Sequence, residues 1–276
     1  MMGGQPTGTR VGRVQLDRLI SQQLSERDQQ ILLDLGRVRL LTGNQVTRLH
    51  FSTLSIHTRD RLRRRVMQRL IDLELVTTLD RQVGGVRAGS SGLIYALSAA
   101  GQRALSLLGA DDGASLPTRA RRPWTPGALF LTHSLAVSEL YVQLVEAERA
   151  GVLELADYRT EPVSWLPNRL GGFLKPDAYL LLRLGDVEDA WAVEVDRATE
   201  SLNTLRRKLL VYVDFANAGQ VGPDDVTPRV LVTVPGVKRL EAVNMLVKDL
   251  PEPASQLLYI ALFDRSVQEL IALLKE

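Results

Sequence analysis

Acidic residues flank two consecutive hydrophobic segments between Leu174 and Phe215, and this pattern constrains the fold more than any other in the chain. Asp177 stands at the start of the first segment, and Glu194 and Asp196 stand at the end of the second. If the two segments pair as antiparallel strands, the three carboxylates meet at one end of a sheet. Buried carboxylates are costly unless a cation or hydrogen bonds compensate them, and Mg²⁺ prefers carboxylate oxygens. The stretch therefore predicts a candidate metal site.

A purely structural interpretation explains the same acids. Asp177 then only begins a strand, while Glu194 and Asp196 are strand-end residues in ion pairs with Arg197 or Arg206. Because perturbed carboxylates occur both in active sites and in structural ion pairs, spacing alone leaves the two interpretations open.

Charge is divided unequally along the chain. Residues 1–127 contain 19 Arg, no Lys and 10 acids, a net charge of +9, whereas residues 128–276 have a net charge of −7. A basic half favours a surface that binds a polyanion, and an acidic half suits a cation site. The chain has no cysteine, which excludes disulfides, cysteine–zinc sites and thiol catalysis.

The length of 276 residues indicates two domains. We expect four parts: a flexible basic arm (1–23) with a short helix in it as an open alternative, a first domain (24–109), a linker rich in Gly, Pro, Asp and Ser (110–127), and a second domain (128–276). No uninterrupted apolar run approaches the roughly 20 residues of a membrane-spanning helix, so we expect a cytoplasmic protein without membrane contact. No heptad pattern is visible, and a homodimer stays an open alternative.

The first domain has the pattern of a winged helix-turn-helix. Ser25 is a good N-cap for a first helix that Gly36 is expected to close, and a second short helix follows Thr42. A third helix over 55–73 precedes a strand at 76–79, a Gly-rich turn and a returning strand at 93–97, and Ser98 caps a closing helix. Three helices, a β-hairpin and a closing helix make this fold.

Arginines cover much of the third helix around an apolar stripe of leucines and valine. We expect this helix to enter the major groove of double-stranded DNA, with the wing also contacting it. The candidate DNA-binding residues are Arg59, Arg61, Arg63, Arg64, Arg65 and Arg87. A solvated basic helix and a protein-interaction module are the alternatives.

The second domain alternates helices and strands in the order αβββαβαβα, so the chain as a whole is α/β (α+β). Its helix over about 199–216 has a buried face, and Lys208 and Tyr212 form an i,i+4 pair on its flank. No HxH motif accompanies the three histidines, and no Gly-rich phosphate loop is present. Relaxase chemistry and NTP hydrolysis are therefore not expected.

The order α-β-β-β-α-β, with Pro-Asp at the second strand and Glu-x-Asp at the third, resembles the PD-(D/E)xK nuclease superfamily. Together with the winged helix and the phrases HSLAVSEL, LKPDAYL, WAVEVDRATES, LRRKLLVYVDF and VLVTVPGVKRLEAV, the chain resembles the replication-relaxation family of plasmids and other mobile elements. The resemblance covers about residues 25–250.

The resemblance implies a catalytic set of Asp177, Glu194, Asp196, Lys208 and Glu139. Asp177 and Glu194 would hold Mg²⁺ or Mn²⁺ with help from Asp196, and Glu139 would be an accessory acid. Asp196 occupies the position where the superfamily has lysine, and Lys208 is a substitute for it. The metal would polarise a phosphodiester and activate a water.

The expected function is therefore a DNA-binding protein of a mobile element that nicks or cleaves DNA with Mg²⁺. The alternative is a catalytically inactive nuclease fold that regulates plasmid replication or transfer by occupying DNA or by binding replication or transfer proteins. A purely protein-directed regulator is a third interpretation. Asp196 in the lysine position favours an inactive fold, and the Asp177–Glu194 pair favours the nuclease.

Overall fold

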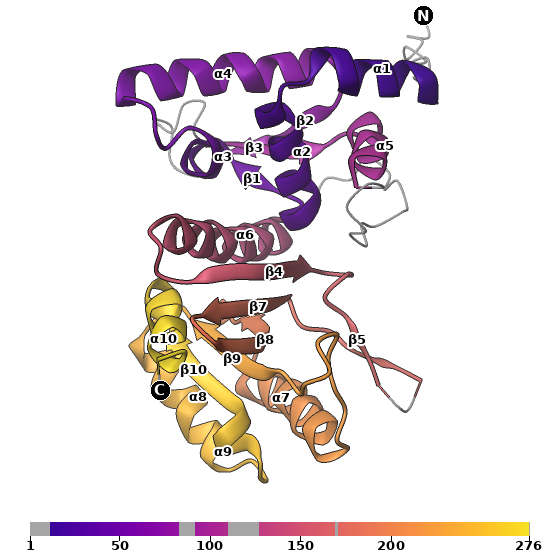
Figure 1. The fold of residues 1–276 in the computed structure, drawn as a ribbon. Coiled ribbons are helices and arrows are strands. Elements are labelled where there is room, and N and C mark those ends of the chain that lie inside the picture. The colour runs from indigo at the N-terminus through magenta and orange to yellow at the C-terminus, as the bar shows by residue number, and fades with distance from the viewer. Residues whose placement is uncertain (1–11, 83–91, 110–126, 169–170, 276) are drawn as a thin grey trace, which may run out of the picture. The chain divides into compact units, whose positions relative to one another are not determined.

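The computed structural model describes residues 12–82, 92–109, 127–168 and 171–275. The chain divides into two compact units, Met1–Thr125 and Pro126–Glu276, and both mix helices with sheets (Figure 1). Arg87 and most of the Gly-rich turn lie outside the described residues, as does most of the predicted linker.

Unit 1 contains five helices among its described residues. They are α1 (Arg13–Gln23), α2 (Glu26–Val38), α3 (Gly43–His50), α4 (Ile56–Asp72) and α5 (Ala99–Leu108). Side-chain caps begin three of them, because the first turn of a helix leaves backbone N–H groups without partners. Ser25 and Thr42 form capping boxes at α2 and α3, and Ser98 accepts from two backbone N–H groups of α5.

Three short strands complete the described part of unit 1. They are β1 (Leu41–Thr42), β2 (Val76–Gln82) and β3 (Leu93–Leu97), and β3 lies between the other two with antiparallel pairing on both sides. The predicted hairpin is confirmed, with Val76 opposite Leu97 and Leu79 opposite Ile94. The sheet packs against α2, α3 and α5. Helix α4 comes immediately before the hairpin in the chain and contacts β2.

Two expectations for unit 1 need correction. Gly36 does not end α2, which continues to Val38; a Cβ at Gly36 would lie 2.3 Å from Leu105 of α5, so the glycine serves the close approach of these helices. The basic arm is in part a helix, since α1 spans residues 13–23 and buries Leu16 to 2% exposure. Residues 13–23 therefore belong to the folded unit.

A five-stranded sheet organises unit 2. The strands are β4 (Glu154–Thr160), β7 (Ala178–Leu184), β8 (Val187–Val195), β9 (Arg229–Val234) and β10 (Leu258–Leu262). They lie in the order β10-β9-β8-β7-β4. The β4-β7 and β7-β8 pairs are antiparallel, whereas β8-β9 and β9-β10 are parallel and need helical crossovers.

Helices cover both faces of this sheet (Figure 1). On one side α7 (Leu202–Asn217) and α8 (Val237–Lys248) join a core cluster with alternate residues of β7, β8 and β9. On the other side α6 (Ala128–Arg149) contacts β4 and β8, and α10 (Ser266–Leu273) contacts α6. The chain also forms α9 (Ala254–Leu257) and a 3₁₀ turn at Phe263–Arg265.

Helix α6 is long and apolar enough to cross a membrane by length and composition, but 61% of its apolar window is buried inside the structure. Tyr158 of β4 donates a hydrogen bond of 2.8 Å to the carbonyl of Val137 in α6 and packs its ring on Tyr141. These contacts are those of a core helix.

A small hairpin extends from the start of β7. Its strands β5 (Leu166–Pro167) and β6 (Phe173–Leu174) pair antiparallel, with Leu166 opposite Leu174. Both leucines are buried in the same core cluster as Leu205 and Leu209 of α7, so the hairpin is anchored to unit 2.

Candidate functional site

Asp177 is held at the point where β7 begins. Its backbone N–H donates to the carbonyl of Val193, and its Oδ2 accepts from the N–H of Val195 at 2.7 Å. The side chain is 9% exposed, and its other oxygen, Oδ1, lies 3.1 Å from His133 Nε2. Strand β8 and helix α6 therefore fix this carboxylate from two sides.

Glu194 lies on β8 and faces α7. The residue is 2% exposed, and its two oxygens contact different side chains of that helix. The hydroxyl of Tyr212 donates to Oε1, and the ammonium of Lys208 pairs with Oε2. Lys208 and Tyr212 are one turn apart, as their i,i+4 spacing predicts, so one helix supplies both partners.

The structure adds His133 to the predicted site. It lies in the first turns of α6 and contacts Asp177. The hydrogen bond to Asp177 raises the pKa of His133, although burial opposes this. The signal in the sequence was weak: a histidine near the start of the helix that precedes the acidic strands.

Charge compensation differs between the two acids. Burial would raise the pKa of Asp177, but the hydrogen bond from His133 and the charge of Lys208 lower it overall. Burial and the charge of Asp177 raise the pKa of Glu194 to about 8, although Lys208 and Tyr212 act against them. Burial lowers the pKa of Lys208, yet Glu194 and Asp177 raise it above its ordinary value. The partners of Asp177 thus favour its ionised form in spite of burial, whereas Glu194 keeps its proton to a higher pH than an ordinary glutamate does.

Asp196 does not join this cluster. It follows the last residue of β8, and its Oδ2 pairs with Arg239 Nε of α8 at 2.6 Å while its Oδ1 accepts from the N–H of Ala198. Among the described residues the three carboxylates are not grouped to hold a metal ion, and that of Asp196 is instead paired with a guanidinium.

Glu139 is also placed elsewhere. It lies on α6, and Gln143 of the same helix donates a hydrogen bond to it at 3.4 Å. It follows His133 by six residues, which is about 9 Å along a helix and on a different side. The accessory role expected for Glu139 gains no support from this position.

The donor set does not fit a resident Mg²⁺ as it is arranged. All four oxygens of Asp177 and Glu194 face a protein donor: His133, the Val195 N–H, Tyr212 and Lys208. Among the described residues, no group of three or more His, Asp and Glu side chains is placed to hold a metal ion. In this arrangement Lys208 supplies compensating charge to Glu194, and His133 lies within hydrogen-bond distance of Asp177.

The arginines of α4 fall into separate groups. Arg61, Arg64 and Arg65 are exposed, and Arg59 is half-buried. Arg63 is 1% exposed and hydrogen-bonds to Tyr95 of β3, so the expectation that it lies on the outer face is wrong. A candidate nucleic-acid surface, the α4 surface, is therefore formed by Arg61, Arg64 and Arg65.

Asp28 explains a further arginine on α4. Its carboxylate is buried, closes the capping box with Ser25 and pairs with Arg69. Arg69 thus ties α4 to the start of α2.

A family model described as "Replication-relaxation" matches residues 32–230 of the chain. No curated protein and no solved structure matches the chain. The matched range includes α4, the β2–β3 hairpin and all of the residues that surround Asp177 and Glu194.

Proposed function

Because the chain belongs to the replication-relaxation family, whose function relates to the replication of mobile elements, we propose that it regulates replication or transfer by binding double-stranded DNA. Unit 1 is the DNA-binding part, and unit 2 is a nuclease-like fold that does not cut. The observation that carries the proposal is the α4 surface of exposed arginines.

The α4 surface suits a DNA groove for geometric and electrostatic reasons. Helix α4 runs over 17 residues, and Arg61 and Arg65 lie four residues apart on one side of it with Arg64 beside them. Helix α3, the turn after it and α4 have the order of a helix-turn-helix, and the β2–β3 hairpin follows as a wing would. Arginines in this position neutralise phosphates and donate to base edges.

Protein donors already occupy the carboxylate oxygens of Asp177 and Glu194, and this favours a unit 2 that does not cut DNA. Its sheet order and crossovers agree with a PD-(D/E)xK nuclease fold, but Asp196 stands in the lysine position and pairs with Arg239. Asp177 and Glu194 already have protein partners on every oxygen. The buried carboxylates therefore need no bound cation to offset their burial.

Affinity for a fluorescent duplex, measured by anisotropy over a range of salt concentrations, tests the DNA-binding role. The triple variant Arg61→Ala, Arg64→Ala, Arg65→Ala should bind more than about tenfold more weakly and lower the salt slope by up to about 2.7, because each lost phosphate contact contributes about 0.9. A control that removes three exposed cations of unit 2, Lys238→Ala, Lys248→Ala, Arg265→Ala, should retain affinity. Equal losses in both variants would reject the α4 surface.

Incubation of supercoiled plasmid with Mg²⁺ or Mn²⁺ tests the absence of cutting. We expect no nicked product from the wild type. Nicking that disappears in Asp177→Asn and in Glu194→Gln would show that a metal displaces His133 and Lys208, and the nuclease interpretation would then replace the regulator. Nicking that survives both substitutions would point to a contaminant.

A further inference from the structure

The β5–β6 hairpin shows an aromatic and cationic face on the side opposite its anchor. Alternate residues of paired strands point to opposite faces. Leu166 and Leu174 point into the core, so their neighbours Trp165, Phe173 and Lys175 lie on the outer face. We call Trp165, Pro167, Phe173 and Lys175 the hairpin face.

The rings of this face are held in fixed positions. The centroids of Trp165 and Phe173 are 6.0 Å apart with their planes at 48°, and Lys175 Nζ lies 4.5 Å from the centroid of Trp165. Trp165 Nε1 donates to Glu161 Oε1 at 3.2 Å, which fixes the indole by its edge. The loop is closed by Asn168, whose backbone N–H donates to the Gly172 carbonyl and whose side chain accepts from the Gly172 N–H.

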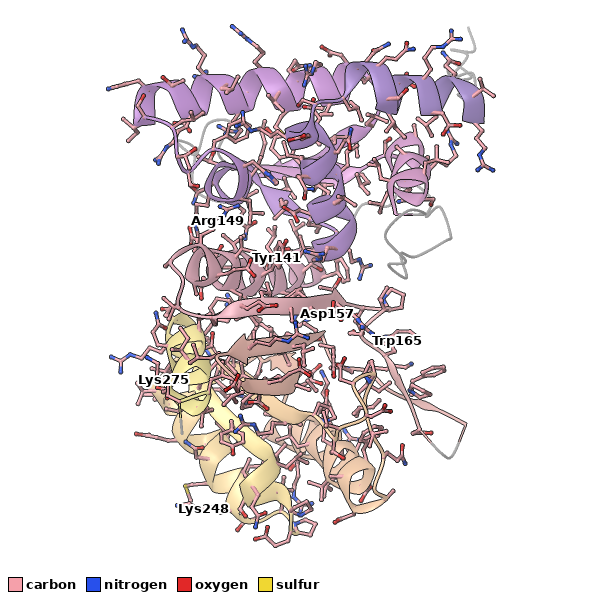
Figure 2. All side chains as sticks on the ribbon, viewed as in Figure 1. Tyr141, Arg149, Asp157, Trp165, Lys248 and Lys275 are labelled. Atoms are coloured by element: carbon pink, nitrogen blue, oxygen red, sulfur yellow. The ribbon has the colours of Figure 1, made fainter. Side chains whose placement is uncertain are left out.

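Phe173 is the unusual member, because a large apolar side chain is left in solvent. It is 52% exposed, and Pro167 and Lys175 beside it are exposed too. Figure 2 labels Trp165 at the base of the hairpin, which extends away from the five-stranded sheet. Anchoring does not need this arrangement, since the two leucines already supply it.

The hairpin face adjoins the Asp177 cluster. Lys175 precedes Asp177 by two residues, and Ser164 Oγ donates to the carbonyl of Pro176 at 2.7 Å. Glu161, which holds Trp165, is close enough for its charge to influence His133. The start of β7 therefore connects the hairpin face directly to the Asp177 cluster.

We propose that the hairpin face binds single-stranded DNA, with a base stacked on Phe173 and the adjacent phosphate near Lys175. Aromatic side chains stack with any base, and a cation next to them tracks the backbone. An apolar peptide would use the rings but has no need of a cation at 4.5 Å from the indole. This site goes beyond the proposed duplex binding by unit 1, and unit 2 would use it to hold an unpaired strand.

Tryptophan fluorescence reports directly on this site. The chain has three tryptophans, of which Trp191 is fully buried. In a Trp124→Phe background, addition of oligothymidylate should quench the emission of Trp165, and Trp165→Phe should remove the response. Quenching that is absent at saturating oligothymidylate would overturn the site.

Substitutions at Phe173 distinguish a nucleobase from an apolar partner. Phe173→Ala and Phe173→Leu should both weaken oligothymidylate binding about tenfold, because each removes the π face. Lys175→Ala should lower the salt slope by about 0.7. Val187→Ala, at another exposed residue of unit 2, should change neither quantity. Full affinity in Phe173→Leu with a loss in Phe173→Ala would indicate apolar contact only and would overturn the stacking.

Substitutions in the hairpin face and in the α4 surface should affect different binding activities. Hairpin variants should retain duplex affinity, and the triple arginine variant of α4 should retain the quenching of Trp165 by oligothymidylate. Loss of duplex binding in the hairpin variants would show that the hairpin face is part of the duplex site and would reject the assignment to a single strand.

Discussion

The α4 surface of unit 1 and the Asp177–Glu194 cluster of unit 2 both gather charge of one sign, but they handle it in opposite ways. Arg61, Arg64 and Arg65 point into solvent, where screening makes their mutual repulsion inexpensive. Asp177 and Glu194 are buried, and every carboxylate oxygen has a protein donor. The charge of the α4 surface is therefore available for a partner, whereas the charge in the cluster already serves the fold.

Arg63 is buried although it lies on α4 beside exposed arginines, and its substitution should have the largest effect on stability. Arg63→Ala should lower the free energy of unfolding by about 3 kcal/mol, because it removes a buried guanidinium and leaves the hydroxyl of Tyr95 without its partner. Urea denaturation followed by circular dichroism measures this. Arg64→Ala, the matched exposed neighbour, should cost less than about 0.5 kcal/mol. Similar costs for the two variants would contradict the division of α4 into inner and outer arginines.

The pH dependence of stability should expose the cluster in unit 2. Since Glu194 has its pKa raised from 4.5 to about 8 in the folded state, the folded protein binds its proton more tightly, and stability falls as pH rises from about 5 to 8. The raised pKa of His133 acts in the same direction above about pH 6.5, its ordinary value. Melting temperatures measured at unit steps of pH should therefore decline.

Glu194→Gln should remove most of this decline, because the Glu194 carboxyl titrates across this pH range only in the folded protein. His133→Gln should remove only the part above about pH 6.5. A decline that is unchanged in Glu194→Gln would mean that the titrating group lies elsewhere.

The smallest predicted effect concerns the capping box of α2. Ser25→Ala should lower the free energy of unfolding by about 1 kcal/mol, because the N-cap loses its acceptor for the N–H of Asp28. Thermal denaturation checks it. Ser25→Thr, which keeps a hydroxyl, should recover most of the loss, and the α4 surface should bind duplex normally in both variants. A change in duplex affinity would indicate that the cap also positions α4 through Asp28 and Arg69.

Local patterns predicted most of the elements, because their causes are local. The caps at Ser25, Thr42 and Ser98 lie where serine and threonine precede apolar periodicity, and the β2–β3 pairing follows from two apolar segments separated by a Gly-rich stretch of sequence. The meeting of Asp177 with Glu194 followed from antiparallel pairing of adjacent segments. Lys208 joined them because its helix leaves the same end of the sheet.

The errors came from partners that are distant in sequence. Arg63 shares a buried stripe with Met67 and Leu70, and an arginine is expected to be exposed unless a partner such as Tyr95 is known. Asp196 is paired with Arg239, a residue on a helix beyond the next strand. The contact of His133 with Asp177 depends on how α6 packs over the sheet. The spacing of residues along the chain does not reveal these tertiary contacts.

The bond from the Val195 N–H to Asp177 has a consequence for folding. In an antiparallel pair, a slip of one residue turns every side chain to the other face. With Asp177 bound to both Val193 and Val195, the β7–β8 pair has a polar lock at one end that only the native alignment satisfies. Any shifted pairing would bury a carboxylate without its amide donor. Asp177 therefore favours the native register of the β7–β8 pair, independently of any ligand.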